Sequence, residues 1–569
     1  MRESYQHQID AGLVKRYQTL EYEIQSDIVR RIKKARKITS TADWQIERIR
    51  ILGKSSRDIK KIVASAVQYD DGEVDKLYKQ VVADEYTANK SKYEQITGKF
   101  VKYEDNLELQ QIVAAIKKNS TEELTNITRS MGFMIDFGNG PQFTDLSDTY
   151  NKMLDQAVVD MTSGAFDYNT VIRRACKQLT DSGLRTSHPF STNPQNTFGV
   201  DYPSGWHNRI DVAARRAIMT GTSQLTGHIM DMNAEWLHVD KFEVSWHVGA
   251  RPEHAAWQGK VYTRKQLETV CGLGTGDGLL GWNCRHEYYL FFDDSTRTYT
   301  DEWLEAQNRR EAEKKSFRGH EYNTYEATQK QRRMETNMRA QREKVKLMQA
   351  GDADPDDIVI EKCKYQAQLD EYKEFSAAFN MPTQTERIYY DLNGRVAPSR
   401  KKYNQIAGDL EETYHKGDLF ANLRAQASER HWFTKYAEKY PGAELWHYRL
   451  NRYAKDNKLI TGEIAPPVKE KAVIGGNPHA KNPNHIIDRM KERGVTSADA
   501  QSYVDNAEFM QVQRRGNGRV YYAADGATNL VRYDDAPETW YAQTAWTKGE
   551  YDENVKKLMD EARRLHGRR

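Results

Sequence analysis

The chain has 569 residues and a formal net charge of +3 at pH 7, and 29% of its residues are charged. Because one hydrophobic core does not extend over this length, we expect three or four folded parts and not a single domain. The near balance of charges gives no indication of a nucleic-acid-binding protein. A mean hydropathy of −0.87 and 33 tyrosines are typical of solvated helices and polar interfaces.

The cysteines and the apolar pattern bound the environment of the chain. Its four cysteines, at positions 176, 271, 284 and 363, are too widely spaced for a disulfide-rich scaffold. No run of eighteen apolar residues and no apolar signal segment is found. We therefore expect synthesis in a reducing cytoplasm and no membrane segment.

Residues 1–135 are predicted to be helical. Apolar residues recur three and four positions apart from Leu13 to Ile32. Thr39–Asp43 has the residue types of a helix start, and a further helix rich in lysine and glutamate is predicted over 71–100. We interpret this part as a helical N-terminal arm with a solvated, charged face.

Residues 136–298 are expected to form a further domain, with a small α+β core around 240–295. Helices are predicted over 147–181 and 207–235, with loops rich in glycine and proline around them. Alternating residues predict one strand over Phe242–Trp246 and a second over Glu287–Phe292. The stretch 247–286 would then lie on loops between two strands, which is a common place for functional sites.

Residues 299–396 are expected to contain a long charged helix and a helical hairpin. Apolar residues are too sparse over 299–349 for a coiled coil, so we predict a single extended helix that needs a partner surface. Gly351–Pro355 would end it, and a second helix is predicted over 356–379.

The remaining chain is divided at a segment rich in proline and glycine. Residues 397–480 are predicted to hold helices over 402–457, followed by a linker at 462–478. Residues 481–569 are expected to form a separate small α+β domain. Its predicted helices cover 485–494, 497–507 and 549–566, and its predicted strands cover 509–513, 519–523, 528–532 and 539–546. The predicted fold class is therefore α+β and multidomain, with mainly helical N-terminal and middle parts.

The stretch 247–286 contains the densest chemistry of the sequence. Four of its residues have the ligand types of a tetrahedral zinc site, and His247 is an alternative ligand. These four are His254, Cys271, Cys284 and His286. Their spacing matches no standard zinc finger, so polar groups that hold a glycine-rich loop by hydrogen bonds are an alternative. A catalytic Cys–His pair is a third, although no acid to orient it is evident.

The same stretch resembles the minor capsid protein 2 family of tailed phages, which is related to the Mu F-type head morphogenesis proteins. The motif residues that carry the resemblance are His247, Arg251, His254, Gln258, Asn283, Cys284, Arg285 and His286. The resemblance covers about residues 1–390, and Cys271 is not part of the family pattern, which weakens a four-ligand zinc site. It implies a low-copy virion protein in the capsid interior or at the portal vertex, made in the bacterial host cytoplasm. Its partners would be the portal protein and other capsid proteins, and it would leave the capsid with the DNA.

The C-terminal domain has a short pattern built of common residues: His485, Arg489, Glu492, Arg493 and Gly494, followed by a small sheet that ends in Thr544. This pattern resembles the barnase, EndoU, colicin and RelE-like ribonuclease toxins. Such a resemblance implies a metal-independent ribonuclease that has two partners, RNA and an immunity protein. Cleavage of RNA without a metal needs a base, an acid and cations that neutralise the phosphate. The candidate catalytic residues are His485, Arg489, Glu492, Arg493, Arg519 and Thr544.

An alternative for this domain is a non-catalytic binding module. His485, Arg489 and Arg493 recur every four residues, as on any solvated helix face. Residues 466–569 carry 17 basic and 15 acidic side chains, and a net charge of +2 is small for an RNA-binding surface. The sequence therefore leaves both interpretations open.

Overall fold

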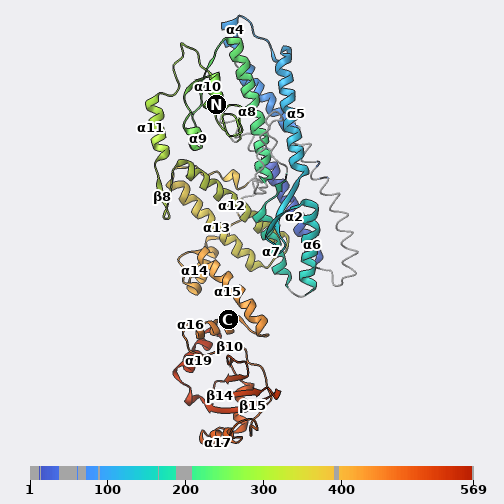
Figure 1. Ribbon diagram of the computed structural model, residues 1–569, viewed down its shortest axis with the longest axis vertical. Helices are drawn as coiled ribbons and strands as arrows, with labels where there is room; N and C mark the ends of the chain where they lie inside the picture. The colour runs from blue at the N-terminus through green and yellow to red at the C-terminus, as the bar shows by residue number, and fades with distance from the viewer. Residues whose placement is uncertain are drawn as a thin grey trace. The chain divides into compact units, whose positions relative to one another are not determined.

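The computed structural model describes residues 14–36, 72–87, 90–163, 166–187, 208–282, 284–389 and 396–566, besides the isolated positions 12, 61 and 64. The chain divides into two compact units, Met1–Ala407 and Gly408–Arg569, which Figure 1 draws from blue to red. Helices and several small sheets confirm the predicted α+β multidomain class. None of the described helices is both long and apolar enough to cross a bilayer. The predicted helix start at Thr39–Asp43 lies outside the described residues.

The first unit is built mainly from long helices around one extended core. Its helices before residue 240 are α2 (Lys15–Ala35), α4 (Lys90–Thr97), α5 (Leu107–Arg129), α6 (Leu146–Thr162), α7 (Tyr168–Ser182) and α8 (Ile210–Leu237). A four-stranded sheet has the order β2-β1-β3-β4, with β1 at Met131–Asp136, β2 at Pro141–Asp145, β3 at Arg185–Thr186 and β4 at Asn208–Arg209. The apolar residues of α2 that set the predicted spacing, among them Leu20, Ile24 and Ile28, are fully buried. The apolar residues that recur three and four positions apart thus form the packed face of α2.

A three-stranded antiparallel sheet follows. Its order is β6-β5-β7, with β5 at Lys241–Val244, β6 at Val261–Thr263 and β7 at Tyr288–Leu290. Phe242 pairs with Tyr262 on one side and with Leu290 on the other, so β5 is central. The two strands predicted around 247–286 are therefore direct neighbours. The last residue of β5, Val244, pairs with the first residue of β7, Tyr288. The chain that leaves β5 and the chain that enters β7 therefore lie at the same end of the sheet.

The predicted single helix over 299–349 is wrong. The structure has α11 (Asp301–Ala312), a hairpin of β8 (Lys315–Phe317) and β9 (His320–Tyr322), and then α12 (Thr324–Ala350). Gly319 adopts a positive φ of 82° in the hairpin turn, which favours glycine. Asn323 then starts α12 with a capping box. The Asn323 side chain accepts the backbone N–H of Glu326, and the Glu326 side chain accepts the backbone N–H of Asn323.

The helix α12 also differs from the prediction in its surroundings. It forms a hairpin with α13 (Pro355–Ala378) and packs on α7 and α2, as Figure 1 shows for the hairpin. Several of its polar side chains, among them Arg339 and Arg342, are buried. The partner surface that the sequence predicted for this helix thus lies within the same unit. Apolar residues are sparse in α12 because several of its buried contacts are polar.

A buried ionic network joins α2, α8 and α12. Arg209 donates to both carboxylate oxygens of Glu21 at 2.8 and 3.1 Å, and Arg339 donates to Asp211 at 2.8 Å. Burial raises the pKa of the Asp211 carboxyl, but Arg339 and Arg209 outweigh this effect and hold it at about 2. Burial, together with the charge of Glu21, raises the pKa of Glu343 on α12. Because ionised groups are costly to bury, each charge in this network depends on its partners.

The second unit is a six-stranded sheet with helices on both faces. Its elements include α15 (Leu419–Lys439), α16 (Leu445–Asp456), α17 (His485–Glu492), α18 (Ser497–Asp505) and α19 (Glu553–His566), and the division between the units falls inside α14 (Arg400–Tyr414). The sheet has the order β10-β12-β13-β14-β15-β11, with β12 at Phe509–Val512, β13 at Gly518–Tyr522, β14 at Gly526–Tyr533 and β15 at Ala536–Thr547. Tyr521 packs in the cluster with α17 and α18, and the adjacent Tyr522 packs in the cluster with α16 and α19. Because neighbouring strand residues point to opposite faces, the two helix pairs cover opposite faces.

The segment 462–478, which the sequence suggested as a linker, is partly sheet. β10 (Glu463–Ala465) pairs with β12, and β11 (Ala472–Val473) runs parallel to β15. Ile464 and Ala465 are fully buried. Prolines at 466 and 467 follow β10 directly, which is compatible with a strand that ends there.

We expect Asp211→Asn to lower the free energy of unfolding of the first unit by about 3–5 kcal/mol, because it removes the ion-pair partner of the buried Arg339 and one of the two carboxylates beside Arg209. Calorimetry on the full chain measures the shift. Glu122→Gln is the matched control, since Glu122 meets Lys118 at 3.9 Å with both side chains exposed, and it should change stability by less than about 1 kcal/mol. Equal small effects of the two substitutions would contradict the role of the network.

We expect the second unit to lose stability on acidification through His447. This imidazole is 5% exposed and its Nδ1 accepts the N–H of Glu444 at 3.1 Å; burial lowers its pKa to about 4 from 6.5. The unfolded chain therefore binds the proton near pH 6.5 and the folded chain only near pH 4, so stability present above pH 6.5 is lost between these values. Denaturant titrations across this range should show a loss on the order of 2 kcal/mol that His447→Gln reduces. The exposed His431, changed to Gln, should leave the wild-type pH profile unaltered.

Candidate functional site

Three side chains of the predicted motif converge where β5 ends and β7 begins. His254 lies on the short helix α9 (Pro252–Ala255), and Cys284 and His286 lie in the segment that enters β7. The Nδ1 atoms of the two histidines are 3.3 Å apart, and the Sγ of Cys284 is 3.8 Å from Nδ1 of His254 and 3.6 Å from Nδ1 of His286. Among the described residues, this is the one group of three or more His, Cys, Asp or Glu residues whose potential ligand atoms lie this close together.

Gln258 fixes the orientation of His286. Its Oε1 accepts the backbone N–H of His247 at 2.9 Å, and it lies 2.9 Å from Nε2 of His286. Because the backbone group only donates, the atom that receives it is the oxygen of the amide. Nε2 of His286 therefore carries the hydrogen, and its Nδ1 presents a lone pair towards Cys284 and His254.

Two groups hold Nε2 of His254. The backbone oxygen of Asp277, which only accepts, lies 2.8 Å from it, and Nη2 of Arg251, which only donates, lies 2.9 Å from it. Nη2 of Arg251 also donates to the carbonyl oxygen of Trp282 at 3.2 Å and to that of Asp277 at 3.4 Å. In the tautomer whose Nε2 donates to the Asp277 carbonyl, Nδ1 of His254 faces the group with its lone pair.

The three side chains are removed from solvent, with exposures of 2% for His254, 2% for Cys284 and 3% for His286. Burial lowers the pKa of His254, and burial together with His247 and His254 lowers the pKa of His286 to about 2. Burial raises the pKa of the Cys284 thiol. Both imidazoles are therefore neutral at pH 7.

The glycine run shapes the loop that brings these residues together. A Cβ at Gly278 would lie 2.0 Å from the carbonyl oxygen of Gly272, and a Cβ at Gly281 would lie 2.3 Å from that of Gly276. No residue with a side chain fits at these close backbone approaches. The run therefore serves a compact loop whose carbonyls reach His254 and Arg251.

The remaining motif residues have separate positions. Nε2 of His247 lies 3.0 Å from the Ser245 hydroxyl, and Cys271 is buried but is not part of the converging group. Arg285 is exposed, and Asn283 lies outside the described residues. The carbonyl of Asp277 was missed by sequence reasoning, because a backbone group leaves no signal in residue identity.

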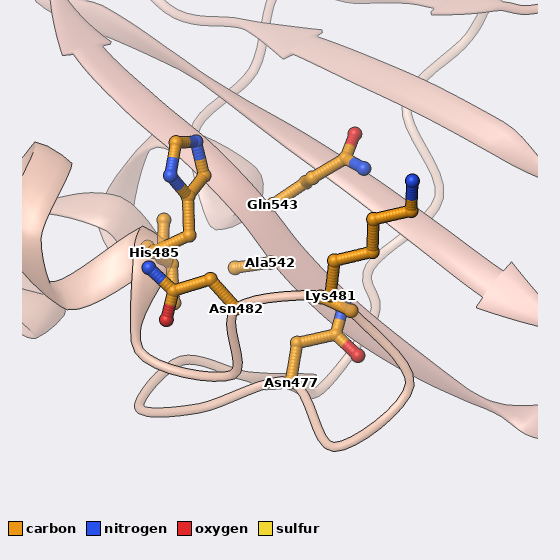
Figure 2. Close-up of a pocket in the computed structure, with 8 residues that line it drawn as sticks. Asn477, Lys481, Asn482, His485, Ala542 and Gln543 are labelled. Carbon is orange, nitrogen blue, oxygen red and sulfur yellow. The ribbon is translucent and has the colours of Figure 1, made fainter.

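A second candidate site lies in the C-terminal unit. It is a cavity of about 230 Å³. Figure 2 shows His485 and Lys481 on either side of Gln543 there. Its lining residues are Asn477, Ala480, Lys481, Asn482, His485, Ile486, Ala542 and Gln543. Of the six predicted catalytic residues, His485 alone lines it. The polar run from Asn477 to Asn484, immediately before α17, was the available signal for Lys481 and Asn482.

The other five predicted catalytic residues lie elsewhere in the unit. Arg489 pairs with Glu492 at 3.1 Å on the exposed side of α17. Arg493 donates to the Thr544 hydroxyl at 2.9 Å and contacts Glu550. Arg519 pairs with Glu470 at 2.7 Å and lies over the ring of Trp540. These pairs are the contacts expected of structural side chains, so His485 and its cavity are the part of the prediction with the geometry of a site.

Comparison with known proteins gives one match. Residues 1–376 match the family model of phage minor capsid protein 2. No curated protein and no solved structure matches the chain. The matched region contains the converging group of His254, Cys284 and His286, and it ends before the C-terminal unit.

Proposed function

Because the chain belongs to the phage minor capsid protein 2 family, we propose that it stands in low copy at the portal vertex, in contact with the portal protein. The family match gives a bacteriophage virion protein of head morphogenesis that interacts with other capsid proteins. The single observation that carries the proposal is this match over 376 residues. The low copy number, the portal contact and exit with the DNA are our inferences from the resemblance of the 247–286 motif.

The first unit is the part that we assign to assembly. The family match and the first unit coincide over residues 1–376, and one hydrophobic core runs from Tyr17 through the three-stranded sheet to Ala353. Continuous packing of this kind gives a rigid body. We propose that this body carries the capsid contacts, so that the second unit is dispensable for incorporation.

A truncation pair tests this assignment. Phage that encode residues 1–407 alone should incorporate the fragment into heads at the wild-type copy number, far below that of the major capsid protein. Phage that supply residues 408–569 alone should not incorporate it. Quantitative mass spectrometry of purified particles measures both, and cross-linking identifies the portal as neighbour. Incorporation of 408–569 in the absence of residues 1–407 would overturn the assignment.

For the second unit we propose a ribonuclease activity without a metal ion. The supporting observation is His485 at the start of α17, which lines a cavity of about 230 Å³ together with Lys481. An imidazole there can take the proton of a ribose 2′-hydroxyl, whose oxygen then attacks the phosphorus and displaces the 5′-oxygen. The ammonium of Lys481 can neutralise the phosphate and give a proton to the leaving 5′-oxygen, so that the products are a 2′,3′-cyclic phosphate and a 5′-hydroxyl.

The geometry narrows the predicted residue set. Glu492 lies seven residues after His485 on the same helix, a rise of about 10.5 Å, so the two do not reach one scissile bond from the helix alone. Lys481 or Asn482 is a better positioned partner. A non-catalytic module that binds another virion protein is the alternative, and the exposed pair of Arg489 and Glu492 would suit it.

Expression of residues 408–569 in a bacterial host tests the activity. This fragment includes β10 and α16, which a fragment starting at 466 lacks. We expect growth arrest with fragmented RNA, relieved by His485→Ala and by Lys481→Ala but not by Arg489→Ala. Total RNA integrity and growth are followed together. Intact RNA and normal growth with the folded wild-type fragment would favour the binding module, and a protein that relieves the arrest would be the immunity partner.

A further inference from the structure

We propose that His254, Cys284 and His286 bind one zinc ion through Nδ1, Sγ and Nδ1, and that this ion holds the 247–286 loop together. The site lies within the assembly unit but does not depend on the portal assignment or on the ribonuclease proposal. Nothing in the family match assigns it. Four observations carry it: the distances between the ligand atoms, their lone pairs, the groups behind them and the segments they join.

The distances match the edges of a tetrahedron. With zinc bonds of about 2.05 Å to nitrogen and about 2.3 Å to sulfur, two nitrogens lie about 3.3 Å apart, and a nitrogen and the sulfur lie about 3.6 Å apart. The observed separations are 3.3 Å between the nitrogens and 3.6 and 3.8 Å from nitrogen to sulfur. One ion therefore fits between the three atoms at ordinary bond lengths without a change of rotamer.

With the histidine hydrogens on Nε2, the three ligand atoms share too few hydrogens. Nε2 of His286 donates to Gln258, so its Nδ1 carries no hydrogen, and the tautomer of His254 that donates to the Asp277 carbonyl leaves its Nδ1 without one as well. The Cys284 thiol has a single hydrogen, and the carbonyl oxygen of His286 at 3.9 Å is a further acceptor for it. A buried nitrogen acceptor without a partner is costly, and a cation between the three atoms removes this cost while the thiol gives up its proton.

The groups behind the ligands have the arrangement usual for zinc sites. A metal-bound imidazole commonly donates its other N–H to a carbonyl, an amide oxygen or a carboxylate, which fixes the ring. Here the Gln258 oxygen and the Asp277 carbonyl take these places. A ligand set of one thiolate and two imidazoles suits zinc or copper and not magnesium or calcium, which take oxygen ligands, and the tetrahedral spacing of the three atoms is that of zinc.

The fourth corner of the tetrahedron is assigned to a water molecule. Cys271 is not part of the group, and Nε2 of His247 faces Ser245. The ion would join α9 to the segment before β7, which are thirty residues apart in the chain. A link of this length restricts the unfolded chain and thus stabilises the loop.

The test uses the full-length chain, purified with a thiol reductant. We expect about one zinc per chain by elemental analysis, and a thiolate-to-cobalt absorption band when cobalt replaces zinc. A strong chelator should lower the unfolding temperature of the first unit, and added zinc should restore it. A wild-type chain that takes up neither zinc nor cobalt under these conditions would overturn the proposal.

Two buried cysteines of the same stretch provide the matched variants. Cys284→Ala should lose the zinc and the cobalt band, whereas Cys271→Ala should keep both. His286→Asn should lose the ion as well. Far-UV circular dichroism establishes that each variant is folded, and the wild-type cobalt band tests the site even where a variant does not fold. Zinc retained in Cys284→Ala, or lost in a folded Cys271→Ala, would contradict the ligand set.

Discussion

The ionic network of Arg209, Glu21, Asp211 and Arg339 is the constraint on which the first unit depends. It places charged groups where three long helices meet, and each helix supplies charges that the others need. A shift of one helix would leave a buried charge without a partner, so the network fixes their relative positions. From α8 the constraint continues to the small sheet, because Asp231 on α8 accepts the Tyr288 hydroxyl of β7 at 2.9 Å. The position of the candidate metal site is thus set by contacts far from it.

Sequence patterns predicted the elements whose signal is local. The spacing of apolar residues gave α2, and alternation gave β5 and β7, because periodic burial follows directly from backbone geometry. The hairpin at 315–322 was missed because its residues are charged like the helices around it, and Gly319 was its main signal. The strands β10 and β11 were missed because they have only three and two residues, which is too few to show the alternation of buried and exposed residues. Only their pairing with distant strands defines them.

The candidate sites show the same limit. Residue types pointed to His254, Cys284 and His286, but no spacing rule distinguished Cys271, which lies in the same stretch, from Cys284. The distinction depends on the turn of the glycine loop, which is a tertiary property. In the second unit the helical spacing of His485, Arg489 and Arg493 suggested a common face, and the structure separates them, with the first at a cavity and the third bonded to Thr544. The catalytic role of these residues and the bound metal remain predictions.

The strand order of the second unit has a consequence for how it could leave a virion. The four strands β12 to β15 follow one another in the chain, but both outer edges of this meander are covered by strands that precede it, β10 and β11. These two outer strands are only three and two residues long, so each presents a short open edge to which another chain could pair. Proteolysis after β11 would remove both short strands, expose two longer edges and favour aggregation. A soluble fragment of this unit therefore has to begin before Glu463.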